Sequence, residues 1–120
     1  MAGERFVLAF ERARLRESGR KDLIEKMEWT SQNRGIDVGY AIRSFDEQGK
    51  ERYIAVKTTN FGPRFPFALS AEEIDFSRAN PDSFAMYRVF NFSRGAKLFM
   101  LEGNVEDTCR LEPITYRAVL

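Results

Sequence analysis

The sequence predicts an α/β domain of mixed α+β type, in which helices flank a central β-sheet in the order α, β, β, β, α, β, β. Three observations predict this fold. The chain opens with apolar residues at helical spacing, two alternating segments joined by a turn fill residues 37–59, and a capping-box sequence at Ser70 precedes two further alternating segments. A length of 120 residues supports one core, so we expect a single domain over residues 1–120.

The composition excludes several classes of function. A net charge of +1 gives no global field toward nucleic acid or membrane, so any nucleic-acid contact requires a local patch. The absence of histidine excludes His-ligated metals, Ser-His-Asp triads and Cys-His nucleophiles. The single cysteine, Cys109, excludes an internal disulfide. With no long apolar run and no signal-peptide pattern, we expect a cytoplasmic protein without a membrane partner.

The first predicted element is a helix over residues 4–17. Its apolar stripe includes Phe6 and Val7, and Glu11 falls on or beside that stripe. A carboxylate there is compatible with a rim residue paired with Arg12 or Arg14, and also with an acid directed toward a site.

After this helix we expect a short second helical segment over residues 22–28 and a first strand over residues 26–31, where Met27 and Trp29 alternate with polar residues. Residues 32–35 read as a loop.

The two central strands are predicted within residues 37–59, with Asp46 and Gly49 in the turn. Strand alternation places Tyr53, Ala55, Lys57 and Thr59 on one face. Lys57 is out of place in an apolar strand. It indicates either a cation directed at an anion or an edge lysine that discourages aggregation.

The second half contains a loop over residues 60–66 and a helix that begins with the capping box at Ser70 and ends before Asn80. Two strands follow, over residues 83–91 and 97–102. The tail, residues 107–120, is expected to form a short strand or coil along one edge.

Several segments together resemble one family. They are G-Y-x-I-x-S-F from Gly39, R-x-I-x-V-K-T-T near Lys57, P-F-A-L-S from Pro66, F-S-R-A-N-P from Phe76, and Y-R-V-F from Tyr87. In this order they resemble the C-terminal domain first described in the NO VEIN protein, a relative of Mrr-type nucleases in the PD-(D/E)xK superfamily. The resemblance implies a restriction-endonuclease-like core, αβββαβ, and a Mg²⁺-dependent DNA endonuclease domain.

The chain departs from the family at two positions that matter for this chemistry. The family pattern has G-Y-D-I and I-E-V-K, whereas here Ala41 and Ala55 replace both acids. The resemblance implies that these positions hold the metal, that Lys57 acts on water and phosphate, and that Glu11 is a further metal or catalytic candidate. Because alanine offers no side-chain oxygen, Mg²⁺ is expected in an active form and not expected to bind well here. Asp37 lies about 13 Å along the strand from the metal position and is no substitute.

Two origins of the alanines stay open. Deliberate inactivation replaces both acids by alanine and leaves the neighbours intact, which is the pattern here, whereas natural degeneration tends to install varied residues. The first interpretation is a nuclease domain from a defence or restriction system, inactive with these alanines. The alternative is a natural pseudonuclease that binds DNA or assembles with proteins. A third interpretation is a protein-binding domain that uses its sheet edge.

Cations and hydroxyls near the predicted strand ends are the candidates for nucleic-acid contact. Each also has an ordinary interpretation as a surface or strand residue. The candidates are Thr58, Thr59, Arg64, Ser70, Arg88 and Arg94. The expected partners are DNA and, by analogy with the family, a larger fused or associated helicase or ATPase protein, with homo-oligomer formation left open.

Overall fold

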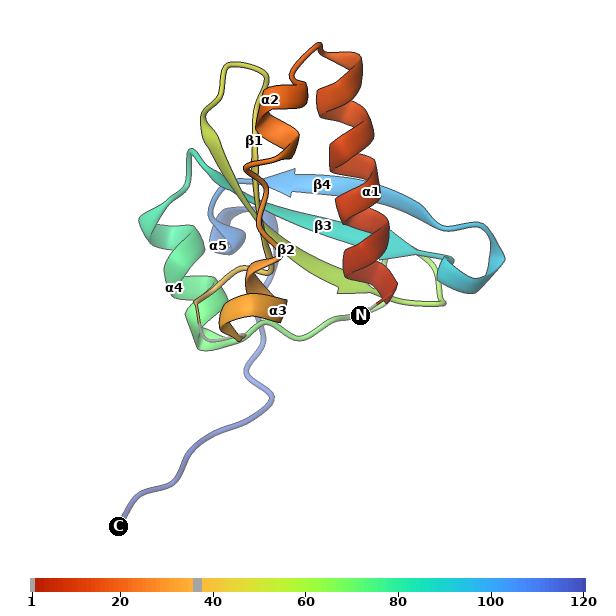
Figure 1. The fold of residues 1–120 in the computed structure, drawn as a ribbon. Helices are drawn as coiled ribbons and strands as arrows, with labels where there is room; N and C mark the ends of the chain where they lie inside the picture. The colour runs from red at the N-terminus through yellow and green to blue at the C-terminus, as the bar shows by residue number, and fades with distance from the viewer. Residues whose placement is uncertain (1, 36–37) are drawn as a thin grey trace.

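The computed structural model describes residues 2–35 and 38–120, and its centre is a four-stranded sheet (Figure 1). The strands are β1 (Ile42–Phe45), β2 (Glu51–Thr58), β3 (Phe84–Phe90) and β4 (Lys97–Glu102), in the spatial order β1-β2-β3-β4. The two outer pairs are antiparallel, and β2 runs parallel to β3. A parallel pair needs a crossover connection, which the segment containing α4 (Ala71–Ala79) supplies.

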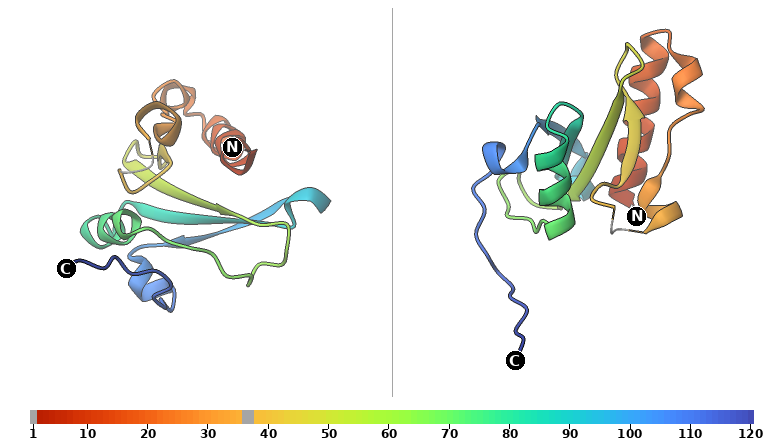
Figure 2. Two further views of the ribbon diagram at one scale, coloured as in Figure 1. Left: turned by 90° about the horizontal axis from the view of Figure 1, so that it is seen from below. Right: turned by 90° about the vertical axis from the view of Figure 1, so that its left-hand side faces the viewer.

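Helices cover both faces of the sheet (Figure 2). The first helix, α1 (Ala2–Glu17), covers one face, and α4 with α5 (Val105–Thr108) covers the other. Three short elements complete the fold: α2 (Lys21–Ile24), α3 (Thr30–Arg34) and the 3₁₀ turn η1 (Phe92–Arg94). The predicted class, a mixed sheet flanked by helices, is confirmed.

Strand alternation divides the apolar core into two main clusters. On the α1 face, Val7 and Leu8 pack against Ile54 and Tyr87. On the α4 face, Ala55 packs with its neighbours Phe84, Met86 and Val105. The predicted two-faced character of β2 is therefore correct, because successive residues Ile54 and Ala55 enter different clusters.

The strand predicted over residues 26–31 is wrong. Glu28 makes one isolated antiparallel bridge with Arg43, through N–H to carbonyl bonds of 3.0 and 2.9 Å, and the chain then turns into α3 at Thr30. The α3 amide of Ser31 donates to the Ala41 carbonyl at 3.0 Å, so this segment caps the entrance to β1. The second helical segment is also shorter than predicted, and α3 occupies most of the predicted loop at 32–35.

The capping box of α4 is confirmed. Ser70 Oγ accepts from the Glu73 amide at 3.1 Å, and the Ser70 amide donates to Glu73 Oε1 at 2.9 Å. The predicted tail begins within α5, and beyond it the chain is exposed coil that extends away from the sheet (Figure 1). Within the residues that the structure describes, no helix combines the length and apolar character needed to cross a bilayer.

Candidate active site

A cavity of about 420 Å³ lies at the C-terminal end of β2, between the start of α1, α3 and the N-terminus of α4. The side chains that matter for its chemistry come from five separate segments. They are Glu4, Ser31, Ala41, Lys57, Ser70 and Glu73.

The cavity exists because β1 is shorter than β2. Pairing begins at Ile42 opposite Ile54, so the last residues of β2 extend past β1 and leave an open sheet edge. Gly39 allows the chain to enter β1 close to α4. Its φ is +94°, and a Cβ there would lie 2.7 Å from the backbone oxygen of Glu72 and 2.6 Å from the Cβ of Phe76. The glycine of the G-Y segment is therefore required both by conformation and by space.

Lys57 reaches the cavity from β2. Its Nζ donates to Glu73 Oε1 at 2.9 Å, and the side chains of the two residues are only 20% and 14% exposed. The same Glu73 oxygen accepts the Ser70 amide, so the ion pair is joined to the capping box of α4. The lysine thus has a fixed position and a carboxylate partner, which a solvated edge lysine lacks.

Glu4, from the first turn of α1, is the acid that the helix contributes to the cavity. It is 8% exposed, and its Oε1 accepts from Trp29 Nε1 at 2.6 Å and from Ser31 Oγ at 2.8 Å. Gly3 lets the start of α1 lie close to the end of β2, because a Cβ at this position would overlap Thr58 Oγ1. Sequence reasoning missed Glu4, although it lies seven residues, or about two turns, before Glu11 on the same helix face.

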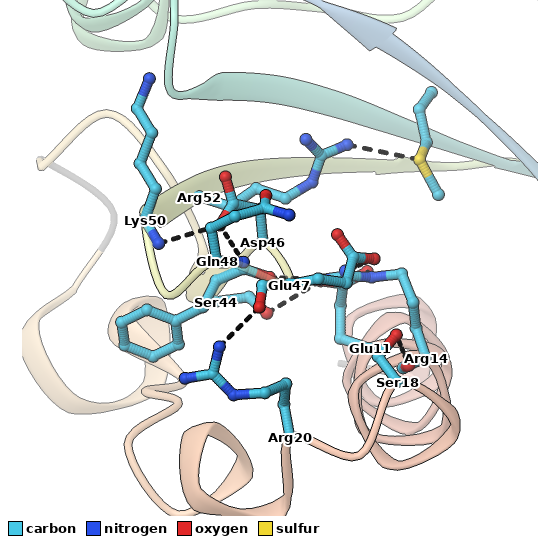
Figure 3. Close-up of polar contacts among 12 residues, drawn as sticks. Glu11, Arg14, Ser18, Arg20, Ser44, Asp46, Glu47, Gln48, Lys50 and Arg52 are labelled. Atoms are coloured by element: carbon cyan, nitrogen blue, oxygen red, sulfur yellow. Dashed lines mark hydrogen bonds and ion pairs between the residues drawn. The ribbon is translucent and has the colours of Figure 1, made fainter.

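Glu11 does not border the cavity among the described residues. Its buried carboxylate accepts from Arg14 (2.6 and 3.1 Å), Ser44 Oγ (2.8 Å) and Tyr87 Oη (2.7 Å). Figure 3 shows Glu11 with Arg14 and Ser44, where α1 meets β1. Burial and the Glu11 charge together raise the pKa of Tyr87. The expected pairing with Arg14 is present, but the carboxylate is fully buried instead of lying at the rim.

Ala41 and Ala55 lie on different sides of the sheet edge. The Ala41 amide donates to the Ile54 carbonyl at 2.8 Å although Ile54 pairs with Ile42, so two residues of one strand oppose one of the other, as in a β-bulge. Ala41 consequently packs in the α1-side cluster and also borders the cavity. Ala55 is fully buried in the α4-side cluster. The expectation that Glu11, Ala41, Ala55 and Lys57 border one cavity therefore holds only for Ala41 and Lys57.

The nucleic-acid candidates occupy three different environments. Thr58, Thr59 and Ser70 lie around the cavity end of β2, exposed or half-buried, and Ser70 borders the cavity. Arg64 is exposed in the loop before α4, and Arg94 is exposed at the end of η1. Arg88, by contrast, is 1% exposed, and burial lowers the pKa of its guanidinium. Its Nη2 donates to the Phe65 carbonyl at 2.6 Å, and its guanidinium lies 4.9 Å from the Phe67 ring centroid.

Two of the three described glutamates that line the cavity, Glu4 and Glu73, are engaged by other side chains, and the third is Glu72. Mg²⁺ requires several carboxylate or water oxygens in octahedral geometry. Here Glu73 binds Lys57, Glu4 Oε1 is bound by Trp29 and Ser31, and no group of three metal-ligating side chains occurs among the described residues.

Comparison with known proteins identifies one family that this sequence matches. Residues 3–101 match the family described as "Protein NO VEIN, C-terminal", and this range contains every residue that lines the cavity. Neither the curated proteins nor the solved structures contain a match. Because the match covers most of the sequence, the chain belongs to the family of the C-terminal domain of protein NO VEIN.

Proposed function

We propose that this chain is a DNA endonuclease domain of the PD-(D/E)xK superfamily whose active site is disarmed by the alanines at positions 41 and 55. The observation that carries the proposal is a half-buried lysine at the end of β2, held at 2.9 Å from a carboxylate and bordering the same cavity as Ala41. A half-buried lysine with a fixed partner in a cavity is a candidate for a functional site.

Phosphodiester hydrolysis requires groups that neutralise the phosphate and hold the attacking water. Lys57 supplies a positioned cation with three donors, suited to a phosphate oxygen or a water. Its partner Glu73 holds the ammonium in place and also lowers the positive charge that an incoming phosphate meets. Ser70 adds a hydroxyl at the N-terminus of α4, where helix amides favour an anion. Among the described residues, the carboxylates of the cavity do not gather into a group of three that could hold a metal ion.

The proposal requires that carboxylates at both alanine positions reach this cavity. Ala41 borders it directly. Ala55 does not border the cavity, but it packs in a cluster with Leu69, which does. The proposal therefore requires a glutamate at position 55 to reach the cavity past Leu69. A carboxylate at position 55 without a metal is buried among apolar side chains, which makes the restored protein depend on a cation for stability.

The test is to restore both acids, Ala41→Asp with Ala55→Glu, and to measure nicking and linearisation of plasmid DNA with Mg²⁺ against an EDTA control. Duplex and single-stranded substrates are both included. We expect cleavage from the double variant and little from either single change, because one carboxylate leaves the nucleophile poorly placed. The matched control is Ala41→Asn with Ala55→Gln, which has nearly the same shape without negative charge and is expected to be inactive.

Adding Lys57→Ala to the restored protein is expected to abolish cleavage and to leave metal binding largely intact. If the restored protein folds and binds Mg²⁺ but cuts nothing, the domain is a pseudonuclease that binds DNA or assembles with proteins. We place the active form in a defence or restriction system, joined to or recruited by a helicase or ATPase, on family analogy. Repeating the cleavage assay with and without such a partner tests that placement.

A further inference from the structure

Two exposed phenylalanines stand out on the loop that joins β2 to α4. Phe61 is 60% exposed and Phe65 is 47% exposed. Their rings stack on each other with centroids 4.5 Å apart and planes inclined by 28°. Large aromatic side chains normally leave water, so two stacked rings held at the surface indicate a surface used for binding.

The backbone beneath both rings is fixed, so their exposure does not come from a loose loop. The Phe61 amide donates to Thr59 Oγ1 at 3.1 Å, and the Phe61 carbonyl accepts from the Asn91 amide at 3.0 Å. The Phe65 amide donates to the Gly62 carbonyl at 3.2 Å. The fold therefore presents these rings at defined positions.

Arg88 provides the strongest of these anchors. It is a fully buried cation whose Nη2 holds the Phe65 carbonyl at 2.6 Å and whose guanidinium stacks on Phe67, while its Nε has no partner in the described part of the chain. Burying an arginine without a carboxylate is costly. The buried Arg88 side chain therefore holds the loop at Phe65, beside the exposed phenylalanine rings.

The surroundings of the rings are basic even though the whole chain is nearly neutral. The sequence has no aspartate or glutamate between residues 52 and 71 or between residues 83 and 101. Within these two stretches, Arg64 and Arg94 are exposed. Arg64 lies between the two phenylalanines in sequence. The Arg94 amide donates to the Asn91 carbonyl, and the Asn91 amide donates to the Phe61 carbonyl. Cations beside exposed aromatic rings complement a polyanion that carries planar bases.

We propose that Phe61 and Phe65 form a stacking platform for unpaired bases of a single-stranded nucleic acid, with Arg64 and Arg94 contacting its phosphates. The outer face of a stacked pair is open for one more planar ring, whereas bases inside a duplex have both faces covered. The same loop continues to Ser70 at the border of the candidate active site, five residues after Phe65. This inference rests on the proposed function only in sharing nucleic acid as the ligand.

The test measures binding without metal, in EDTA, with the chain as it stands. Labelled oligothymidylate and oligouridylate of about 20 nucleotides are compared with a duplex of equal length by fluorescence anisotropy at low and high salt. Both single strands are expected to bind more tightly than the duplex. Phe61→Ala and Phe65→Ala are each expected to weaken single-strand binding between about five-fold and a hundredfold.

The Phe61→Leu/Phe65→Leu variant separates base stacking from general apolar contact. Leucine keeps most of the apolar area but has no aromatic face, so this variant is expected to lose single-strand binding as the alanine variants do, while tryptophan at both positions retains it. Tyr116→Ala, at an 81% exposed position on the tail, is the control and is expected to bind as the parent does.

Equal affinity for duplex and single strand, or unchanged binding by the leucine variant, would overturn the platform. Unchanged binding by the leucine variant is the result expected of a general apolar surface, such as a docking surface for lipid or protein. The outcome is separable from the nuclease proposal. Cleavage by the restored protein without phenylalanine-dependent binding contradicts only the platform, and phenylalanine-dependent binding without restored cleavage contradicts only the nuclease.

Discussion

Replacing Glu11 by alanine is expected to cost stability, because its carboxylate joins α1 to the sheet. The carboxylate is fully buried and accepts four hydrogen bonds, two from Arg14 and one each from Ser44 and Tyr87. Removing one partner of a buried ion pair costs about 3–5 kcal/mol. Arg14 is 21% exposed and keeps a second bond to Glu47 at 2.8 Å, so we expect the lower end, about 3 kcal/mol.

This loss corresponds to a fall in Tm of about 12 °C for a domain of this size. Urea unfolding followed by the fluorescence of Trp29, the single tryptophan, gives the free energy of unfolding. The control is Glu17→Ala, an exposed glutamate on the same helix, which is expected to change stability by less than about 0.5 kcal/mol. A Glu11→Ala variant as stable as the Glu17→Ala variant would refute the structural role.

Three further predictions concern Gly3, Tyr87 and Glu73. Gly3→Ala is expected to destabilise the fold by about 1–3 kcal/mol through the clash with Thr58, and adding Thr58→Ala should recover most of that loss in a double-mutant cycle of urea unfolding. The pKa of Tyr87 is higher in the folded than in the unfolded chain. Above about pH 10 the unfolded chain therefore binds fewer protons than the folded chain, and stability falls as the pH rises. The Tyr87→Phe variant should show a smaller fall in alkaline melting curves. Glu73→Gln frees Lys57 and should steepen the salt dependence of single-strand binding by about 0.7 in log–log slope, whereas Glu72→Gln, also at the cavity, should change it less.

The fold class could be predicted because local patterns and the global fold agree at most elements. The alternation in β2, the capping box at Ser70 and the apolar stripe of α1 each specify one structure by themselves. The segment around Trp29 could not be predicted in this way. Its alternation resembles a strand, but its side chains bond across the fold to Glu4, and that contact is visible only in three dimensions.

The candidate site could be predicted in part. Ala41 and Lys57 meet at the cavity, as the hairpin pattern indicates. The predicted face of α1 was correct, but the predicted turn of that helix was not. Glu4 and Glu11 lie on the same stripe of α1, and periodicity cannot choose between them. The position of Ala41 relative to Ala55 depends on an extra residue at the start of β1, and a bulge leaves no signal in a period-two pattern.

We propose that acids restored at positions 41 and 55 hold one cation beside Lys57, and Mg²⁺ titration of the Ala41→Asp/Ala55→Glu variant measures this directly. This variant is expected to be less stable than the parent in EDTA, because both acids are placed at buried positions without a cation to offset their charge. Mg²⁺ at about 100 times its Kd should then stabilise it by about 2.7 kcal/mol in thermal unfolding, while the Asn/Gln variant and the parent do not respond. A folded Asp/Glu variant whose Tm does not change with Mg²⁺ or Mn²⁺ would contradict the claim that these positions form one site.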